Sequence, residues 1–506
     1  MRHDFTALRP GGLPGGFTGT GWQLAPVARH PRNTSAIRAV ASPDYHVAFP
    51  SICKTHSGDL LVVYREGFTH AVSEDPHDGK IALIRSTDGG CTWSGRVIIM
   101  DADDYDDRNA AIACAPNGQL LVCWDKWKPP THRGAFAMLS DDDGHTWSDP
   151  IRLEPVADVH TRSPALMRRD GRWLIPLAEG EGDGQAAYAT LLDPRTGQSE
   201  MVPITPVGDK NLADEVCVTR AADGALVALG RAVRERVLWQ TRSTDEGSTW
   251  ATPWLSEIPS QYAPGDLTTM ADGRLLCSFS FRERRNERLV LSCDHGATWD
   301  IENSVDVFDG TMAVGGDRSY PASVQVDEST IGTVLYETQA HPTGGAIYFV
   351  TTPLSEFDRP PVTALYAASD ARLTVSVPGE VGQVRFRYRF TGRFGDAPNR
   401  LEVALDETVF AYQMGATPDR KGAINWVSVR RDGGDGEDTE YSSHEALGDW
   451  FDDGNEHELT LCRSAGGWTM SLDGHVQITA AGPEAPTAVT IAAVRAGIAL
   501  YELEVT

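Results

Sequence analysis

Arginine, glutamate and tyrosine residues recur at equivalent places in six similar stretches of the chain. Each stretch has a short strand, a glycine turn and a second, apolar strand, as in residues 49–64. The residues at the first-strand starts are Ala48, Arg108, Arg162, Glu215, Asp266 and Tyr320, and those at the second-strand ends are Arg65, Asp125, Glu179, Arg231, Arg282 and Glu337. Arginine binds both oxygens of a carboxylate, while glutamate and tyrosine exchange protons or attack a bound group. If the two sets meet, they form a pocket that fixes an anion and reacts with it; the alternative is an ion-pair network that seals a channel.

A second repeat, Ser-x-Asp-x-Gly-x-Thr-Trp, marks the elements that must bring these residues together. It begins at Ser86, Ser140, Ser243 and Ser292. Asp and Gly favour a tight turn, because Asp accepts from nearby backbone N–H groups and Gly adopts positive φ. The Trp is expected to fill a layer between sheets. The copies start about 50 residues apart, except for one gap of about twice that length, which indicates a repeat architecture. The third unit has lost its copy and keeps only a remnant at residues 193–197.

Six four-stranded units of this length close radially as a β-propeller. The stretch Gly21–Val27 is predicted to add a strand to the last unit, near residues 345–352. Later strands, such as Gln383–Phe390, alternate between apolar and polar residues and predict a sandwich. The sequence therefore predicts an all-β protein. A six-bladed catalytic β-propeller spans residues 1–355, a linker spans 356–372, and a lectin-like or jelly-roll β-sandwich accessory domain spans 373–506.

Composition limits the partners. The 506-residue chain has a formal net charge of −26, which argues against nucleic acid and anionic membranes. There is no run of 18 apolar residues and no secretory signal. The eight cysteines lack a CxxC pair, which favours free thiols and a cytoplasmic location; secretion by another route stays open. We expect no cofactor and no catalytic metal. A structural Ca²⁺ at Asp101–Asp107 stays open beside the simpler reading of a solvated acidic loop.

The Ser-x-Asp-x-Gly-x-Thr-Trp turns resemble the Asp boxes of the sialidase superfamily, and residues 40–355 resemble its six-bladed propeller. The stretch Asp214–Arg231 is similar to a sialidase segment, which implies that Glu215 polarises the nucleophile and Arg231 grips the substrate carboxylate. The stretch Ser319–Glu337 resembles the nucleophile segment. It implies that Tyr320 attacks and that Glu337 orients an arginine. Arg284 resembles another carboxylate-binding arginine, with Arg282 and Arg285 as competitors.

Two departures from the family pattern stand out. Where sialidases have Phe/Tyr-Arg-Ile-Pro, this chain has Val47-Ala48-Phe49-Pro50, so Ala48 replaces the first arginine. Arg65 is the candidate to supply the missing cation, held by Glu337. The acid/base aspartate of the family lies in the next loop, where this chain offers His70, Asp75 and Asp78. We rank His70 first, because histidine titrates near neutral pH. The remaining substrate-binding candidates are Arg108, Arg162 and Arg318.

These residues predict an exo-acting retaining glycoside hydrolase of sialidase type, which releases a terminal sialic or other ulosonic acid through Tyr320. A carboxylate at the anomeric centre repels a carboxylate nucleophile, so a phenol is better suited. The alternatives are a lyase acting on uronate-containing glycans and a non-catalytic glycan-binding propeller. The expected partner is a carbohydrate with a carboxylate. The second domain is compatible with homo-oligomer contacts, and its Trp426, Trp450 and Trp468 are either core residues or sugar platforms.

Overall fold

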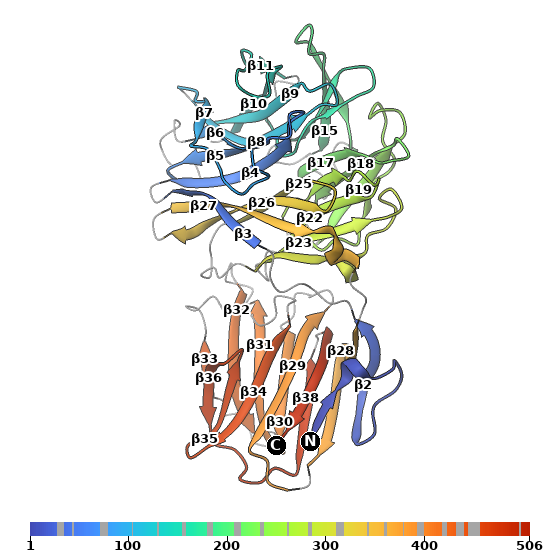
Figure 1. Ribbon diagram of the computed structural model, residues 1–506, viewed down its shortest axis with the longest axis vertical. Helices are drawn as coiled ribbons and strands as arrows, with labels where there is room; N and C mark the ends of the chain where they lie inside the picture. The colour runs from blue at the N-terminus through green and yellow to red at the C-terminus, as the bar shows by residue number, and fades with distance from the viewer. Residues whose placement is uncertain are drawn as a thin grey trace.

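The computed structural model contains two β-sheet bodies, a propeller and a second sheet domain (Figure 1). It describes residues 1–27, 35–42, 45–70, 79–103, 105–128, 131–153, 158–179, 186–206, 214–232, 237–260, 263–281, 286–309, 318–341, 344–358, 362–377, 379–391, 399–416, 423–431, 440–443, 456–494 and 497–506. The helical elements in these ranges are the short 3-10 turns η1 (Phe5–Ala7), η3 (Ile301–Asn303) and η4 (Leu354–Asp358). No helix in this part of the chain is long and apolar enough to span a bilayer. The all-β prediction is confirmed.

Six antiparallel sheets form the blades of the propeller. Blade 1 comprises β4 (His46–Lys54), β5 (Leu60–Gly67), β6 (Lys80–Ser86) and β7 (Val97–Met100); blade 2 comprises β8 (Asp106–Cys114), β9 (Leu120–Lys128), β10 (Thr131–Ser140) and β11 (Ile151–Arg152). Blade 3 comprises β12 (Val159–His160), β13 (Leu166–Met167), β14 (Trp173–Glu179), β15 (Ala187–Leu192) and β16 (Ser199–Pro203); blade 4 comprises β17 (Asp214–Arg220), β18 (Leu226–Arg231), β19 (Leu238–Ser243) and β20 (Trp254–Leu255). Blade 5 comprises β21 (Asp266–Thr269), β22 (Leu275–Phe281), β23 (Asn286–Ser292) and β24 (Val305–Asp309); blade 6 comprises β25 (Arg318–Gln325), β26 (Thr330–His341), β27 (Gly344–Pro353) and β3 (Ser35–Ser42). The predicted six blades are confirmed.

The ring closes through an N-terminal strand, but not through the predicted one. β3 pairs with β27, from Ser35 opposite Thr351 to Ser42 opposite Gly345. The predicted closing strand lies in β2 (Phe17–Val27), which pairs instead with β28 (Val362–Ser376) of the second domain. Trp22 is buried there, and Gly19 lies so close to β28 that a Cβ would meet the Arg372 carbonyl oxygen at 2.1 Å. The prediction for Gly21–Val27 is therefore wrong. Residues 1–27 belong to the second domain, and most of the predicted linker is strand β28.

Apolar layers between successive blades hold the propeller together. Leu61 and Val63 of blade 1 pack with Ile112 and Val122 of blade 2, and equivalent clusters join the later blades. Both faces of a middle strand are covered, so the run Leu60–Tyr64 is wholly buried. Each fully buried Leu or Val contributes roughly 1.5–3 kcal/mol. This explains why the second strands are continuous apolar runs rather than alternating ones.

The four Asp boxes form one repeated turn on the face opposite the second-strand ends. In the first box, Asp88 accepts from the backbone N–H of Thr92 at 2.9 Å and from its hydroxyl at 2.6 Å, while the Gly90 N–H donates to Ser86 Oγ at 2.8 Å. These hydrogen bonds, led by the Thr92 hydroxyl, lower the pKa of Asp88 to about 2. The Trp of the fourth box, Trp299, is buried; those of the other three are half-buried against the apolar layers.

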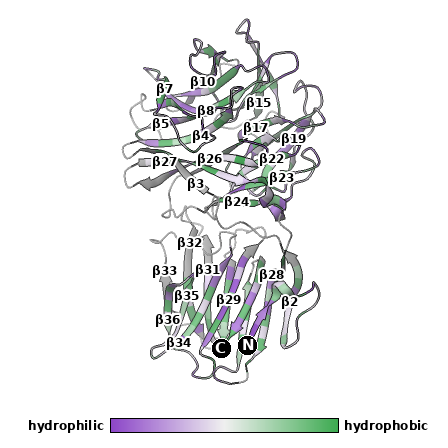
Figure 2. Cartoon of the chain, viewed as in Figure 1, coloured by the Kyte–Doolittle hydropathy of each residue, from purple (hydrophilic) through white to green (hydrophobic). Residues whose placement is uncertain are grey.

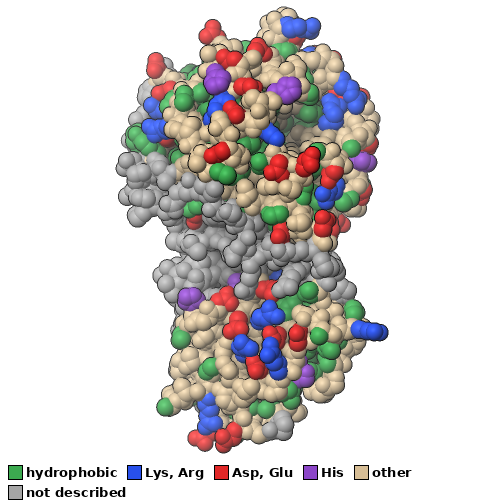
Figure 3. Space-filling view, in the orientation of Figure 1, with side chains coloured by type: hydrophobic (Ala, Val, Ile, Leu, Met, Phe, Trp, Pro, Cys, Tyr) green, Lys and Arg blue, Asp and Glu red, His purple; other side chains and the backbone are tan. Residues whose placement is uncertain are grey.

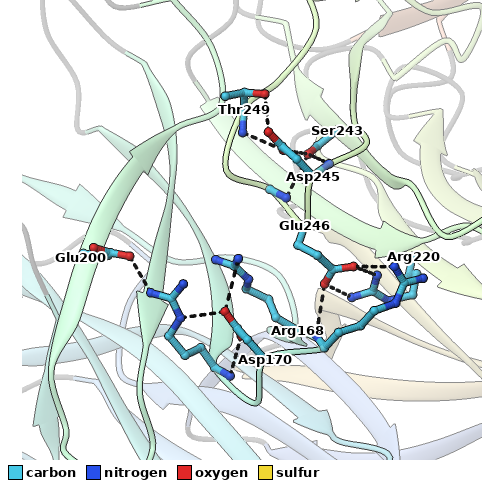
Figure 4. A network of polar contacts seen from close by, with 11 residues as sticks. Arg168, Asp170, Glu200, Arg220, Ser243, Asp245, Glu246 and Thr249 are labelled. Atoms are coloured by element: carbon cyan, nitrogen blue, oxygen red, sulfur yellow. Dashed lines mark hydrogen bonds and ion pairs between the residues drawn. The ribbon is translucent and has the colours of Figure 1, made fainter.

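Charged side chains brace the Asp box of blade 4, Ser243–Trp250, against blade 3 on this basal face (Figure 4). Glu246, inside the box, accepts from Arg220 at 2.8 Å and from the backbone N–H of Arg169 at 3.1 Å. Beside it, the network also joins Arg168 to Asp170, Asp170 to Arg172, and Arg172 to Glu200. The predicted remnant of the third box is a turn in which Asp193 accepts from the backbone N–H of Arg195. The boxes thus serve the packing of the blades and lie away from the candidate chemistry.

The second domain is a single curved sheet that is nearly closed. Its strands follow the order β33-β32-β31-β30-β37-β28-β38-β29-β34-β35-β36, with β1 beside β38 and β2 beside β28. The strands not yet bounded are β1 (Arg2–Asp4), β29 (Gln383–Thr391), β30 (Asn399–Leu405), β31 (Thr408–Ala416), β32 (Ala423–Arg431), β33 (Glu440–Ser443), β34 (His457–Ser464), β35 (Gly467–Leu472), β36 (His475–Ala480), β37 (Ala488–Val494) and β38 (Gly497–Val505). The end strands β33 and β36 contact each other, so the sheet folds over one core as a sandwich does.

Residues in the strands of this domain alternate between core and surface, as predicted. In β34, His457, Leu459 and Leu461 are buried while the residues between them are half-buried, and hydropathy alternates along β29 and β34 in Figure 2. Charged side chains cover the outer face, including the pair Arg385–Glu504 at 2.7 Å (Figure 3). Trp468 is a core residue whose Nε1 donates to the Pro483 carbonyl at 2.9 Å. The side chains of Trp426 and Trp450 lie outside the described residues.

Candidate active site

The predicted polar residues meet at the face of the propeller opposite the Asp boxes, which we call the mouth. First-strand starts pair with second-strand ends in Ala48 with Arg65, Arg108 with Asp125, Asp214 with Arg231, and Arg318 with Glu337. The inner strands β4 and β8 touch, and β25 touches both β4 and β21. The backbone register therefore collects the ring of side chains that the repeat predicted.

Backbone strain is concentrated at the mouth. Four inner strands carry a bulge with a non-glycine residue at positive φ: Phe49 (56°), Asn109 (51°), Glu215 (27°) and Tyr320 (57°). Such conformations cost about 1–3 kcal/mol each and cluster at functional sites. A bulge also turns a side chain away from the direction that the pleat would give it.

Tyr320 is held rigidly at this face. It is 8% exposed, and the Arg162 Cζ lies 4.3 Å from its ring centroid. The ring of Phe49 meets it edge-on at 5.1 Å, and that of Tyr336 lies 5.9 Å away. The tyrosine that resembles the family nucleophile is therefore fixed between a cation and two aromatic rings.

Phe49 is a mouth residue that the sequence analysis missed. Its ring lies 5.6 Å from the ring of His70 and 5.4 Å from that of Tyr336, and the Arg108 Cζ lies 5.7 Å from its centroid. The available signal was Phe49-Pro50, which matches Tyr320-Pro321 in blade 6. Both aromatic residues precede a proline and have positive φ.

Arg65 lies in a buried ion pair. Its Nε and Nη2 each donate to one oxygen of Asp106 at 2.8 Å, and both side chains are 0% exposed. A third nitrogen, Nη1, donates to the Thr69 carbonyl at 2.9 Å. Asp106, from the neighbouring blade, thus occupies the place that we expected for Glu337. In this arrangement the guanidinium supports the mouth from below and turns no open edge toward a substrate.

Arg108 extends the same cluster toward the mouth. Its Nη1 lies 3.5 Å from Asp106, and its Nη2 donates to the His70 carbonyl at 3.2 Å. Burial lowers the pKa of Arg108, and the charge of Asp106 opposes that effect. His70 itself is exposed at the rim, so the loop bearing the first-ranked acid/base candidate is tied to Arg108.

Glu215 and Arg231 form the second ion pair of the mouth. Arg231 Nη1 lies 3.0 Å from Glu215 Oε2. The Glu215 side chain is 8% exposed and that of Arg231 is 26% exposed. Arg231 is thus more open to solvent than Arg65 or Arg108, and it is well placed to turn toward an incoming carboxylate.

A histidine cluster beside blade 3 was also missed. His132 Nδ1 lies 2.7 Å from Asp125, which also accepts from the Asn109 side chain and the Thr161 backbone. The His132 ring lies 5.1 Å from that of His160. His132 lies near the start of β10, the third strand of its blade. No repeat pattern singles out functional residues there, so no signal in the sequence pointed to it.

Two more carboxyl groups near the mouth titrate unusually. Burial raises the pKa of Asp107 to about 7, although the Ala102 N–H and the Trp124 Nε1 each donate to it at 2.8 Å. Burial likewise raises the pKa of Asp266 to about 6, against the opposing effects of the Ser323 N–H and the Arg162 charge. Both groups favour their neutral form more than an ordinary aspartate does.

Some predicted residues lie outside the described part of the chain, namely Asp75, Asp78, Arg282, Arg284 and Arg285, together with the side chain of Arg318. Glu337 is buried on β26. Within the described residues, no group of three or more His, Cys, Asp or Glu side chains converges as metal ligands would.

This fold and this mouth define a six-bladed propeller with an arginine- and tyrosine-lined centre. The chain belongs to the BNR repeat-like domain family, whose model matches residues 58–333. It is similar to a sialidase from Bacteroides fragilis, with 24% identity over 362 residues. That match covers 61% of this chain and 63% of the relative, so less than two thirds of the relative is spanned.

Solved structures show the same propeller fold. A Hadza microbial sialidase has a TM-score of 0.51 and 20% identity, covering 61% of this chain and 66% of that one. An intramolecular trans-sialidase from Ruminococcus gnavus, in complex with oseltamivir carboxylate, has a TM-score of 0.53 and 14% identity, covering 65% and 99%. A protein of unknown function from Dyadobacter fermentans has a TM-score of 0.53 and 18% identity, covering 67% and 99%. The chain is a divergent member of the sialidase superfamily.

Proposed function

We propose that the protein is an exo-acting, retaining glycoside hydrolase that releases a terminal sugar bearing a carboxylate, such as a sialic or other ulosonic acid. The observation that carries the proposal is Tyr320, fixed at positive φ with a guanidinium against its ring. In the proposed reaction, Tyr320 Oη forms a bond to the anomeric carbon as the bond to the leaving oxygen breaks. Water then displaces the phenolate, so the configuration is retained.

The other mouth residues have separate proposed roles. Glu215 takes the phenol proton. Its carboxylate lies 3.0 Å from Arg231, and this ion pair holds both side chains at the mouth. Arg231 binds the substrate carboxylate in the two-pronged manner that arginine favours. His70, beside Phe49, protonates the leaving oxygen. These roles neutralise the anionic sugar with cations and leave a neutral nucleophile to approach it.

A glycoside screen tests this proposal. Methylumbelliferyl glycosides of sialic acid and other acidic sugars are offered to the wild type, Tyr320→Phe and Glu215→Gln, with Asp245→Asn of a basal Asp box as the control. The expected result is a released 2-keto sugar acid of retained configuration, lost in Tyr320→Phe, reduced at least about 100-fold in Glu215→Gln and kept in the control. Full turnover by Tyr320→Phe would refute the nucleophile. Unsaturated products that absorb ultraviolet light would identify a lyase. Glycan binding without turnover would identify a non-catalytic binding propeller.

A further inference from the structure

Arg162 crosses the centre of the propeller. It follows β12 in blade 3, yet its guanidinium lies 4.3 Å from the ring of Tyr320 in blade 6, on the opposite side of the ring of blades (Figure 1). Its charge also acts on Asp266 in blade 5 and on Cys217 in blade 4. The guanidinium therefore lies at the middle of the channel, and the residue is only 5% exposed.

This cation lacks the carboxylate partner that its neighbours have. Four mouth arginines have described side chains: Arg65, Arg108, Arg162 and Arg231. The first two approach Asp106 and the last pairs with Glu215. Among the described residues, Arg162 makes no ion pair, and its buried Nε has no hydrogen-bond partner. The charges of Asp266 and Arg162 act on each other, but the described contacts include no ion pair between them.

We infer that Arg162 is a positioning residue that stabilises the phenolate form of Tyr320. This inference rests on the proposed role of Tyr320 as the nucleophile. A cation against an aromatic face is attracted to the ring, and more strongly once the ring carries the phenolate charge. Negative charge develops on the Tyr320 oxygen twice in the proposed cycle. It develops as Glu215 takes the phenol proton while Oη attacks, and again when water breaks the glycosyl–Oη bond and the electron pair returns to Oη.

The other charged or titratable groups around Tyr320 are distributed over its neighbouring elements. Arg108 on β8 acts on Tyr320 through its charge. The ring of Tyr336 on β26 lies 5.9 Å from that of Tyr320. Among the described residues, the strands packed against β25 also carry Asp266 on β21, Glu337 on β26 and His46 on β4, and the ring of His70 lies beside Phe49. Glu215, the proposed base, lies on β17. Arg108 shares the charge of Asp106, so Arg162 is the stronger stabiliser of an anion on Tyr320.

The test is a phenol titration of the full chain without substrate. The ultraviolet absorbance of tyrosinate is followed with pH in the wild type, Arg162→Lys and Arg162→Met, each compared with the same protein carrying Tyr320→Phe. In Arg162→Met, we expect the Tyr320 step to move up by about one to two pH units. Arg162→Lys, which keeps the charge, should move it by less than half as much. Arg168→Lys, a buried arginine of the same blade on the basal face, should leave the step where it is.

Kinetics on the best glycoside complete the test. We expect kcat to fall at least about tenfold in Arg162→Met with KM nearly unchanged, because the residue acts through Tyr320. An unchanged phenol step in both Arg162 variants would overturn the inference, as would a large rise in KM at constant kcat, which would make Arg162 a substrate ligand. If Arg162→Met does not fold, Arg162→Lys decides by the same titration. A shifted step in a protein that hydrolyses no glycoside would refute the proposed function and with it the catalytic part of this inference, whereas an unchanged step in an active hydrolase would refute the inference alone.

Discussion

Replacing Asp106 by asparagine should destabilise the propeller by about 3–5 kcal/mol, the usual result of removing one partner of a buried ion pair. Asp106 and Arg65 are both 0% exposed and share two hydrogen bonds of 2.8 Å. The substitution keeps the volume of the side chain, so the loss arises from an uncompensated guanidinium and not from a cavity. The Thr69 carbonyl still holds one nitrogen at 2.9 Å, which favours the lower half of that range.

A double-mutant cycle measures the effect. Urea unfolding is followed for Asp106→Asn, Arg65→Met and the combined Arg65→Met, Asp106→Asn variant. The double variant should lose less stability than the sum of the two single losses, because the second substitution removes a charge that the first had left without its partner. Asp101→Asn is the matched control, since the pair Lys80–Asp101 of blade 1 is more than 40% exposed and should contribute less than about 1 kcal/mol. Loss of less than about 1 kcal/mol in Asp106→Asn would refute the reasoning.

The same variants decide whether Arg65 binds substrate. If the guanidinium supports the mouth from below, the folded double variant should keep KM within about tenfold of the wild type. If Arg65 grips the substrate carboxylate, KM should rise by about 100-fold or more, as expected for a lost charged contact. The second result would show that the arginine leaves Asp106 when substrate binds.

Three further predictions follow from other parts of the chain. Burial raises the pKa of Asp107 to about 7, so the folded state keeps a proton that the unfolded state releases. The free energy of unfolding should therefore fall as pH rises from about 4 to about 7. In Asp107→Asn, the urea midpoint should no longer show that fall. Trp22→Ala should destabilise the second domain by about 3–5 kcal/mol and leave turnover unchanged, whereas a loss confined to the propeller would contradict the β2–β28 pairing. His70→Ala should lower the hydrolysis rate of glycosides with poor leaving groups at least about 100-fold and that of nitrophenyl glycosides much less. Equal losses for both kinds of substrate would exclude His70 as the acid. So would a selective loss that appears in His132→Gln and not in His70→Ala.

The blades could be predicted because their repeat is local. Each Asp box satisfies its own backbone through one carboxylate, so the pattern is visible wherever it occurs. The box then fixes where each strand begins, and the antiparallel register places Arg65 opposite Ala48 and Arg231 opposite Asp214. Residues at equivalent points of each repeat must gather at one face.

The N-terminal strands could not be assigned by the same reasoning. Both Phe17–Val27 and Ser35–Ser42 precede the first blade and have strand-like composition. Which one closes the ring depends on pairing with residues more than 300 positions away. Only the burial of Trp22 against the second domain distinguishes them, and that contact has no local signature in the sequence.

The sequence predicted which arginines lie at the mouth but not which carboxylate each of them pairs with. Ala48 drew attention as a lost arginine, although the informative residue is its neighbour. The bulge at Phe49 turns an aromatic ring toward Tyr320, and this depends on a one-residue shift in the β4–β5 register. The partner of Arg65 likewise comes from another blade, so its identity depends on how the blades meet.

The charges of the chain favour a substrate with one carboxylate over a polyanion. Arg65 and Arg231 are each matched by a carboxylate, and Arg108 shares Asp106. Arg162 remains as a buried cation without an ion-pair partner among the described residues. The chain as a whole carries a formal charge of −26, so it repels polyanions at long range. A single carboxylate on a terminal sugar meets this repulsion only once and can pair with Arg231 at the mouth. A long uronate polymer meets the same repulsion many times over, and this favours the exo-acting hydrolase over the lyase.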